Sequence, residues 1–495
     1  MMSSFQYLKQ LVEEQHSIVV LDDFFPNLLS GFRIAEYNWY LRHFPQLVVY
    51  STNPDFDSVH ATYAQHYPQH SDRVKPYDDS SLNGCTFVYM NFLNNAHHFL
   101  LDLHSRCIPF LMTLYPGGGF GLWEPESDAK LLQILKSPLL LGIIATQNVT
   151  LDYLKEKGCK VPVHYIYGGV VHPIYFERRK EYKDNHFVHD SLNICFVAAR
   201  YMEKGANKGY PQFIEIVHQL IREFHHLKFT VVGNFNADDV FLDDTARKSI
   251  TFIESLTTAD LKDFFLTQDI IISPNRPFLL HQGNFDGFPT GCCVEASLCG
   301  VAMICSDELK LNYHYTDGVD IVICRPVSDT IVKAVKNLIL DSELLERIRI
   351  RGQSISLKIF DPKKQLGKRV SILEKAYNYQ KVKWPIKLIE FFKLAKETLI
   401  YHTNYIRCIE TELSVLRKKH PDKLEQIIAE QTTYIHNIEA DLTTRGKYIE
   451  ELEQTITVQT THIHRVETEL AKLQSLWLSR LKSVGKKLSQ LIKSS

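Results

Sequence analysis

Residues 284–307 read NFDGFPTGCCVEASLCGVAMICSD, and this stretch decides how the fold is interpreted. A loop rich in Gly and Pro leads into a short helix of small apolar residues, which we expect to begin near Pro289 or Thr290. Gly300 is suited to end that helix, and a buried strand is expected after it. A loop, a helix and a buried strand in this order are typical of a parallel α/β sheet.

Glu295 is the only charged residue of the expected helix. A buried carboxylate is unfavourable unless hydrogen-bond donors satisfy it, and a ligand with vicinal hydroxyl groups, such as a ribose, would supply them. The alternative is a solvent-facing side chain on an ordinary amphipathic helix. Because small Cys, Ala and Ser residues surround Glu295, we favour close packing and a binding role. The helix N-terminus near Thr290 also offers free N–H groups to a phosphate.

Short apolar runs extend this pattern from about residue 190 to 375. The segment Tyr210–Phe224 carries apolar residues at helical spacing, and Thr257 or Thr258 is suited to cap a further helix. Strands are expected at 193–199, 228–232, 250–253, 270–273, 302–305 and 321–324.

The loop after the first of these strands is rich in cations. Arg200 stands where the strand ends, and Lys208 stands just before the next helix. Together they would neutralise a diphosphate, Arg through its planar fork and Lys as a point charge. The alternative is a pair of solvated loop side chains. Lys204 also precedes a glycine, but we prefer Lys208 because the helix follows it directly.

The first zone of the chain, up to about residue 185, repeats the alternation of apolar runs and helix-length segments. Strands are expected at 17–21, 47–50, 86–90, 110–114, 141–146 and 163–167. A loop with Gly31 follows the first strand and leads to a helix over 32–43. Two consecutive α/β domains imply a cleft between them, because open parallel sheets bind ligands at the carboxyl ends of their strands.

Gly117, Gly118 and Gly119 follow the expected strand at 110–114. Three glycines in a row indicate a loop that is mobile or closely approached by another group. The segment lacks the strand, GxxxxGK and helix of a P-loop. We interpret it as a loop on the acceptor side of the cleft.

From about residue 385 the chain changes character. Apolar residues recur every seven positions from Ile435 to Trp477, which predicts a coiled coil and a homo-oligomer. After Leu476 the chain carries Lys and Arg beside apolar residues and no acid. Such an end can lie on an anionic membrane surface, and a solvated helix end is the alternative. The predicted domains are therefore 1–187, 188–384 and 385–495.

Composition excludes several classes of protein. The 495 residues carry Lys+Arg 56 and Asp+Glu 57, a net charge of −1, which argues against nucleic acid as a partner. No apolar run approaches the roughly 20 residues that span a bilayer, and the N-terminus does not resemble a signal peptide. The ten cysteines form no CxxC pair. We therefore expect a cytoplasmic protein with reduced thiols.

The motifs from 190 to 375 occur in the order found in one enzyme family. A strand, Arg, a loop, Lys-Gly and a helix are followed by Phe229-Thr-Val-Val-Gly233, then by Asp269-Ile-Ile-Ile-Ser-Pro, then by Gly-Phe-Pro, Glu-Ala and Cys-Gly. This zone resembles the donor-binding domain of retaining, nucleotide-sugar-dependent glycosyltransferases of family 4. The resemblance implies an α/β fold of GT-B type, with two Rossmann-like domains that face a cleft, followed here by a long helical and coiled-coil region.

The resemblance also implies roles for individual residues. Arg200 and Lys208 would bind the donor diphosphate, Glu295 the ribose, and Asp286 the donor sugar. In the family a glutamate stands eight residues before the ribose-binding one, whereas this chain has Gly287 there, so Asp286 is the nearest acid. The remaining donor-binding positions would be Gly31, Gly233, Phe288, Pro289 and Thr290. For Gly31 the alternative is a plain turn between a strand and a helix.

The resemblance predicts an enzyme that moves a sugar from a nucleotide diphosphate to a hydroxyl acceptor with retention. No protein nucleophile, metal or cofactor is expected. We expect a glycan or lipid-linked acceptor, a role in bacterial cell-surface polysaccharide or lipopolysaccharide synthesis, and peripheral contact with the inner face of the membrane. One alternative is a coiled-coil scaffold with a degenerate GT-B domain. Another is a different two-domain nucleotide-sugar enzyme, such as an epimerase.

Overall fold

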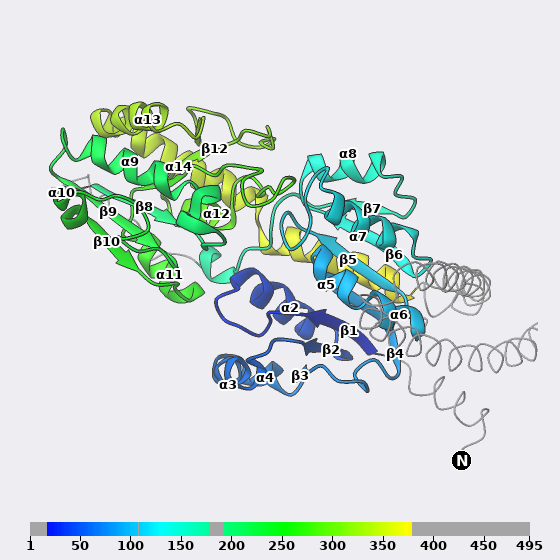
Figure 1. Cartoon of the computed structure of the whole chain (residues 1–495). Coiled ribbons are helices and arrows are strands. Elements are labelled where there is room, and N and C mark those ends of the chain that lie inside the picture. Colours follow the sequence, from blue (N-terminus) through cyan, green and yellow to red (C-terminus); the bar gives the residue numbers. More distant parts are fainter. Residues whose placement is uncertain (1–16, 107, 178–191, 379–495) are drawn as a thin grey trace, which may run out of the picture. The chain divides into compact units, whose positions relative to one another are not determined.

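A computed structural model describes residues 17–106, 108–177 and 192–378. These residues belong to one compact unit, Met1–Val382. The predicted coiled coil and the basic end of the chain lie outside the described residues. Figure 1 shows two sheets, the first coloured blue to cyan and the second green.

The first sheet has seven parallel strands in the order β3-β2-β1-β4-β5-β6-β7. Its strands are β1 (Ser17–Asp22), β2 (Leu47–Ser51), β3 (Val74–Pro76), β4 (Cys85–Asn91), β5 (Phe110–Leu114), β6 (Leu140–Ala145) and β7 (Val163–Tyr165). The helices are α2 (Gly31–His43), α3 (Phe56–His66), α4 (Pro68–Ser71), α5 (Leu93–His98), α6 (Leu100–Ser105), α7 (Pro125–Lys136), α8 (Asn148–Glu156) and the 3₁₀ turn η1 (Pro173–Phe176).

The second sheet has six parallel strands in the order β10-β9-β8-β11-β12-β13. Its strands are β8 (Leu192–Val197), β9 (Leu227–Val232), β10 (Ile250–Ile253), β11 (Ile270–Ser273), β12 (Ala302–Ser306) and β13 (Val322–Cys324). The helices are α9 (Tyr210–Leu220), α10 (Asp244–Ser249), α11 (Thr258–Phe265), α12 (Gly291–Leu298), α13 (Ser328–Leu340) and α14 (Ser342–Ile359), with the 3₁₀ segment η2 (Glu203–Lys208) before α9.

Both sheets therefore have doubly wound, Rossmann-like topology, in which the strand order reverses beside the first strand. The central strands β4, β5, β11 and β12 are buried along their whole length. Such continuous burial is what a parallel sheet covered by helices on both faces requires, and it explains why these strands read as unbroken apolar runs. The predicted α/β fold class is confirmed.

The chain returns to the first sheet after completing the second. Residues 362–378 are helical, and their side chains Val370, Leu373 and Tyr377 pack into the core that β1, β4 and α2 build. The segment falls within the predicted second domain, 188–384, and its apolar side chains pack on the first sheet.

Candidate active site

A cleft with a volume of about 790 Å³ lies at the carboxyl ends of the strands and is lined by residues of both sheets. A volume of this size is in the range of small-molecule sites. The structure brings most of the predicted residues together here: Gly31, Arg200, Lys208, Gly233, Asp286, Pro289, Thr290 and Glu295 all line the cleft. They come from the ends of β1, β8, β9 and β11 and from the start of α12.

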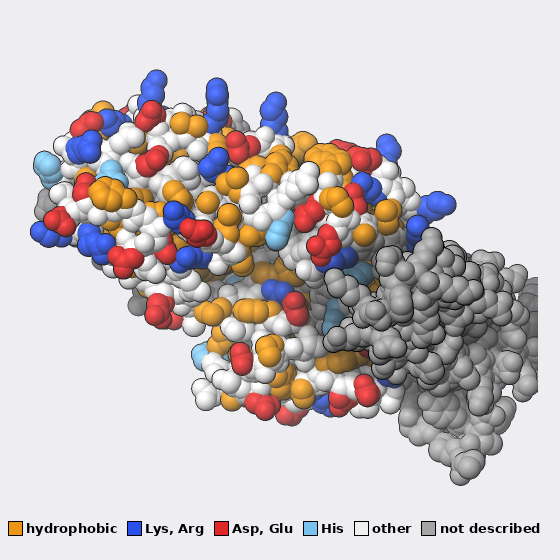
Figure 2. Space-filling view, in the orientation of Figure 1, with side chains coloured by type: hydrophobic (Ala, Val, Ile, Leu, Met, Phe, Trp, Pro, Cys, Tyr) orange, Lys and Arg blue, Asp and Glu red, His pale blue; other side chains and the backbone are white. Residues whose placement is uncertain are grey.

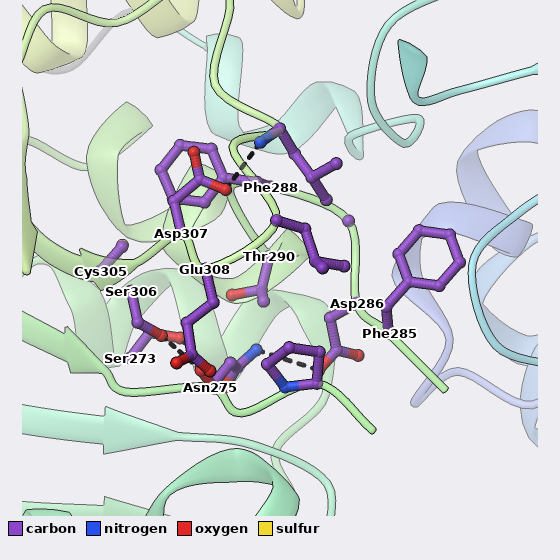
Figure 3. Close-up of a pocket in the computed structure, with 14 residues that line it drawn as sticks. Ser273, Asn275, Phe285, Asp286, Phe288, Thr290, Cys305, Ser306, Asp307 and Glu308 are labelled. Carbon is purple, nitrogen blue, oxygen red and sulfur yellow. Dashed lines mark hydrogen bonds between the residues drawn. The ribbon is translucent and has the colours of Figure 1, made fainter. Parts of the chain in front are cut away.

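Lys208 and Asp286 form an ion pair in the wall of the cleft. Lys208 ends η2 and is only 8% exposed, and its Nζ donates to Asp286 Oδ1 at 2.6 Å. Burial disfavours the charge of Lys208, but the Asp286 carboxylate outweighs this effect and raises the lysine pKa. Asn275 Nδ2 donates to the second oxygen, Oδ2, at 3.0 Å (Figure 3). Both oxygens of Asp286 are therefore engaged, and sequence reasoning missed Asn275.

Arg200 is held by a residue that the sequence did not indicate. Its Nη1 lies 2.7 Å from Asp239 Oδ1, and Asp239 Oδ2 accepts from the backbone of Asn236 at 2.9 Å. Asp239 lies in the loop after β9, about forty positions from Arg200 in the chain. No local motif marks such a pair. The pair fixes the guanidinium at the edge of the cleft without consuming all of its five donors.

Glu295 differs from the other acids of the cleft because it has no hydrogen bond or ion pair to any residue that the structure describes. Burial raises the pKa of its carboxyl group to about 8, and the neighbouring Cys292 thiol adds to the rise. Its carboxylate form requires donors that a ligand or solvent must supply. The predicted close packing around Glu295 agrees with this environment.

The N-terminus of α12 opens into the same cleft. Thr290 is its N-cap, and no side chain caps the helix. The first helical hydrogen bond runs from Val294 N to Thr290 O, which leaves the amides of residues 291–293 without helical acceptors. A helix of this kind attracts an anion through its N–H groups and its dipole. The helix begins at Gly291, one or two residues later than the sequence predicts.

At two of the predicted positions a glycine is needed, because a neighbouring residue lies too close to the backbone for a Cβ atom. Gly233 has φ +127°, and a Cβ there would lie 2.0 Å from the backbone oxygen of Ala198. At Gly31 the backbone is ordinary, but a Cβ would lie 2.6 Å from Thr258 Oγ1. Gly31 begins α2 and Thr258 begins α11, so this glycine allows the two helices to approach each other.

The remaining predicted residues do not line the large cleft. Gly117, Gly118 and Gly119 all have positive φ, and a Cβ on Gly118 would lie 2.4 Å from the ring of Phe92. Their loop turns tightly against the first sheet. Phe288 accepts a hydrogen bond from Tyr167 Oη at 2.6 Å through its carbonyl. It lines a smaller pocket of about 30 Å³ beside the cleft, together with Asn275 and Asp286 (Figure 3).

The wall that the first sheet contributes includes a group of aromatic side chains around Arg33. Arg33 lies over the rings of Phe24, Phe32 and Phe92, at 5.4, 5.0 and 4.8 Å from their centroids. Its Nε donates to Asp22 Oδ2 at 3.0 Å. Phe92 has φ +70°, an uncommon conformation for a large side chain and a frequent one near functional sites. Sequence reasoning passed over these residues because aromatic side chains usually read as core.

In the described part of the chain, neither the surface charges nor the cysteine thiols indicate a functional site more strongly than the cleft does. Figure 2 shows acidic and basic side chains interspersed over the visible face. None of the cysteines that the structure describes is joined in a disulfide. Within the described ranges, no group of three or more acidic, His or Cys side chains is placed to hold a metal ion. Among the helices described, none combines the length and apolar character needed to cross a membrane.

Comparison with known proteins confirms the family resemblance for the second sheet. Residues 178–354 match the family model of glycosyl transferases group 1. No curated protein sequence matches the chain.

Solved structures with the same fold cover most of the described chain. The HepE protein of Anabaena, crystallised with UDP, matches with a TM-score of 0.54 and 13% identity, over 73% of this chain and 100% of its own. A glycosyltransferase of Rickettsia africae gives 0.52 and 13%, over 73% and 98%. Sucrose-phosphate synthase of Thermosynechococcus elongatus gives 0.50 and 12%, over 73% and 100%. These likenesses confirm the predicted GT-B fold.

Proposed function

We propose that this protein transfers a sugar from a nucleoside diphosphate to a hydroxyl acceptor with retention of configuration. One observation carries the proposal: Arg200, Lys208, the open N-terminus of α12 and the unpaired Glu295 all line one cleft. This combination offers positive charge for a diphosphate and a carboxylate for vicinal hydroxyl groups. The match of residues 178–354 to glycosyl transferases group 1 supports the same reading.

The positions of the charged side chains in the cleft suggest how they would assist the transfer of the sugar. The difficult step is departure of the diphosphate from an oxocarbenium-like carbon, and fixed positive groups stabilise the departing charge. Lys208 and Arg200 supply such groups, and Asp286 and Asp239 hold them in place. The proposal includes no protein nucleophile and no resident metal or cofactor. The acceptor hydroxyl would attack on the face that the sugar's leaving group vacates.

The biological setting rests on the resemblance and on the predicted coiled coil and basic end. We propose synthesis of a bacterial cell-surface polysaccharide or lipopolysaccharide on the cytoplasmic side of the inner membrane. The acceptor would be a glycan or a lipid-linked glycan. Oligomerisation through residues 435–477 and contact of the basic end with lipid belong to the same proposal and lie outside the described residues.

A binding screen tests the activity at its first step. UDP, GDP, ADP and their sugars are added to the purified chain, and the melting temperature is measured. One nucleotide class should raise it, and Glu295→Ala should abolish the rise because the ribose contact is lost. Glu223→Ala, at an exposed acid of α9's neighbouring turn, is the matched control and should keep the rise. A well-folded protein that responds to no nucleotide would instead favour the scaffold.

A further inference from the structure

Two polar residues at the end of β6 stand out in the wall of the cleft that the first sheet forms. Thr146 and Gln147 directly follow the strand and line the cleft, and they are 1% and 2% exposed. Gln147 is also the N-cap residue of α8, yet its side chain makes no capping hydrogen bond. The end of β6 and the start of α8 account for the position of these two residues. They do not account for the polar character of the two side chains.

Both side chains hold a buried oxygen without a partner. Thr146 Oγ1 and Gln147 Oε1 have no hydrogen bond to any residue in the described part of the chain. A buried polar atom in this state costs stability, and nearly all such atoms in folded proteins are paired. Valine and leucine would fill the same space without that cost. The two oxygens are therefore explained best by a ligand in the cleft that donates a hydrogen bond to Gln147 Oε1 and exchanges one in either direction with the Thr146 hydroxyl.

Their position shows which part of a ligand they face. A Cβ built on Gly287 would lie 2.8 Å from Gln147 Nε2, so the amide touches the loop that carries Asp286. Asp286 in turn binds Lys208 at 2.6 Å. The Gln147 amide is thus next to the loop of Asp286, and Asp286 pairs with Lys208, the cation that we propose binds the diphosphate. A group bonded directly to the diphosphate is the part of the donor that comes closest to this position.

We infer that Thr146 and Gln147 bind hydroxyl groups of the sugar that the donor carries, an inference that rests on the proposed function. A diphosphate offers only acceptor oxygens at neutral pH. It would accept from the Thr146 hydroxyl but would leave Gln147 Oε1, which can only accept, without a partner. A sugar hydroxyl donates one hydrogen bond and accepts others, which suits the Gln147 amide on both of its sides. Residues of the first sheet therefore recognise the transferred sugar, while residues of the second sheet bind the nucleotide and its phosphates.

The test separates affinity for the sugar from affinity for the nucleotide. Gln147→Leu and Thr146→Val keep shape and remove the polar atoms. Calorimetric dissociation constants are measured for UDP against UDP-glucose and UDP-N-acetylglucosamine, GDP against GDP-mannose, and ADP against ADP-glucose. We expect each variant to bind the nucleoside diphosphate within about twofold of wild type. The nucleotide sugar should bind about tenfold more weakly, which corresponds to one lost hydrogen bond.

The matched controls are two buried, unpaired side-chain oxygens that lie away from the cleft. Thr86 Oγ1 and Gln268 Oε1 are also buried and unpaired among described residues, and neither residue lines the cleft. Thr86→Val and Gln268→Leu should change neither dissociation constant. The ligand-free melting temperature of Gln147→Leu should equal or exceed that of wild type, because the removed oxygen had no partner.

The outcomes distinguish the two proposals. If wild type binds neither nucleoside diphosphates nor nucleotide sugars, the proposed function fails and the inference fails with it. If wild type binds both, but Gln147→Leu and Thr146→Val weaken the nucleotide sugar no more than the diphosphate, only the inference is overturned. A lower melting temperature together with equal weakening of both ligands would assign the two residues a structural role instead.

Discussion

The two sheets handle charge in opposite ways. The second sheet has an apolar core, built by side chains such as Ile194, Phe213 and Val335, and its ionisable residues Lys208 and Glu295 line the cleft. The first sheet instead holds a pair of ionisable side chains, Glu36 and Arg369, that are fully buried and do not line the cleft. The difference indicates that the Glu36–Arg369 pair stabilises the fold, whereas Lys208 and Glu295 stand where a ligand can contact them.

The buried charges of the first sheet form one network. Glu36 of α2 accepts from Tyr89 Oη at 2.5 Å and from Tyr40 Oη at 2.8 Å, and Asn91 Nδ2 donates to its other oxygen at 3.1 Å. Arg369 lies with its Nε 3.7 Å from Glu36 Oε1, and both side chains are fully buried. Because Arg369 belongs to the helical segment 362–378, the network ties the end of the described chain to the first sheet.

The largest expected effect comes from breaking this network. Arg369→Met leaves Glu36 buried without its cation, so we expect a loss of about 3–5 kcal/mol in the free energy of unfolding. Urea denaturation followed by circular dichroism measures it. The double variant with Glu36→Gln should recover part of the loss, because it removes the unpaired charge.

The control for this variant is Lys336→Met on the second sheet. Lys336 pairs with Glu223 on the surface at 2.5 Å, and a surface pair of this kind contributes less than about 1 kcal/mol. Similar losses for Arg369→Met and Lys336→Met would contradict the contrast between the two sheets.

The next largest effect is expected on catalysis rather than on stability. Lys208→Gln should lower turnover by roughly 10²–10³-fold, because it removes one preorganised positive group from the departing diphosphate. Lys204→Gln is the matched control, since Lys204 also precedes a glycine but its side chain is 58% exposed. We expect Lys204→Gln to change turnover by less than about twofold. The reverse order would move the diphosphate site to Lys204. Steady-state kinetics with the nucleotide sugar found in the screen provide the measurement.

Much of the fold could be predicted because parallel strands are buried on both faces. The expected ranges 110–114, 250–253 and 270–273 coincide with β5, β10 and β11. The helix expected over Tyr210–Phe224 ends at Leu220, although Phe224 still packs on the core from the turn that follows. The spacing of apolar residues therefore reports burial beyond the last helical hydrogen bond. The strand β3 (Val74–Pro76) was not predicted, because only Val74 is buried and the segment shows no apolar run.

The candidate site was predictable only where its residues stand in one local motif. Arg200, Lys208 and Glu295 follow strands in a family order and line the cleft. Asp239 and Gln147 were missed, because each acts on a residue far away in the chain, Arg200 for one and Gly287 for the other. At position 287 the family has a glutamate and this chain has a glycine. A side chain there would meet Gln147, because a Cβ on Gly287 would lie 2.8 Å from Gln147 Nε2. A single sequence does not reveal which distant side chains meet.

The next prediction concerns the pH dependence of stability. The pKa of Glu295 is about 8 in the folded protein against an ordinary 4.5, because burial disfavours the carboxylate. The folded state thus binds this proton more tightly than the unfolded state. The resulting stabilisation is complete below about pH 4.5 and is lost as the pH rises through about 8. Glu295→Gln cannot titrate, so it should gain melting temperature relative to wild type between about pH 5 and pH 9.

Melting curves of wild type and Glu295→Gln at several pH values measure this difference. A constant offset across that range would mean that Glu295 titrates normally and is well solvated. The exposed acid Glu223, changed to Gln, provides the reference for a group without this burial. A rising difference for Glu295 alone would sharpen the contrast, since an uncompensated acid then lies in the cleft whereas the buried Glu36 of the first sheet is paired with Arg369.

The smallest expected effect concerns the place where the two sheets' helices approach. Gly31→Ala puts a Cβ 2.6 Å from Thr258 Oγ1, so the two helix ends must separate slightly or Thr258 must rotate. Overpacking of this kind costs about 1 kcal/mol or a little more, and we expect nucleotide-sugar affinity to fall about fivefold. The double variant with Thr258→Ala removes the near atom and should restore the affinity, which a double-mutant cycle by calorimetry measures. If Thr258→Ala gives no relief, the glycine is needed by the ligand itself. Gly31 would then approach the donor phosphates directly, as the family resemblance implies, and the first sheet would share in binding the diphosphate.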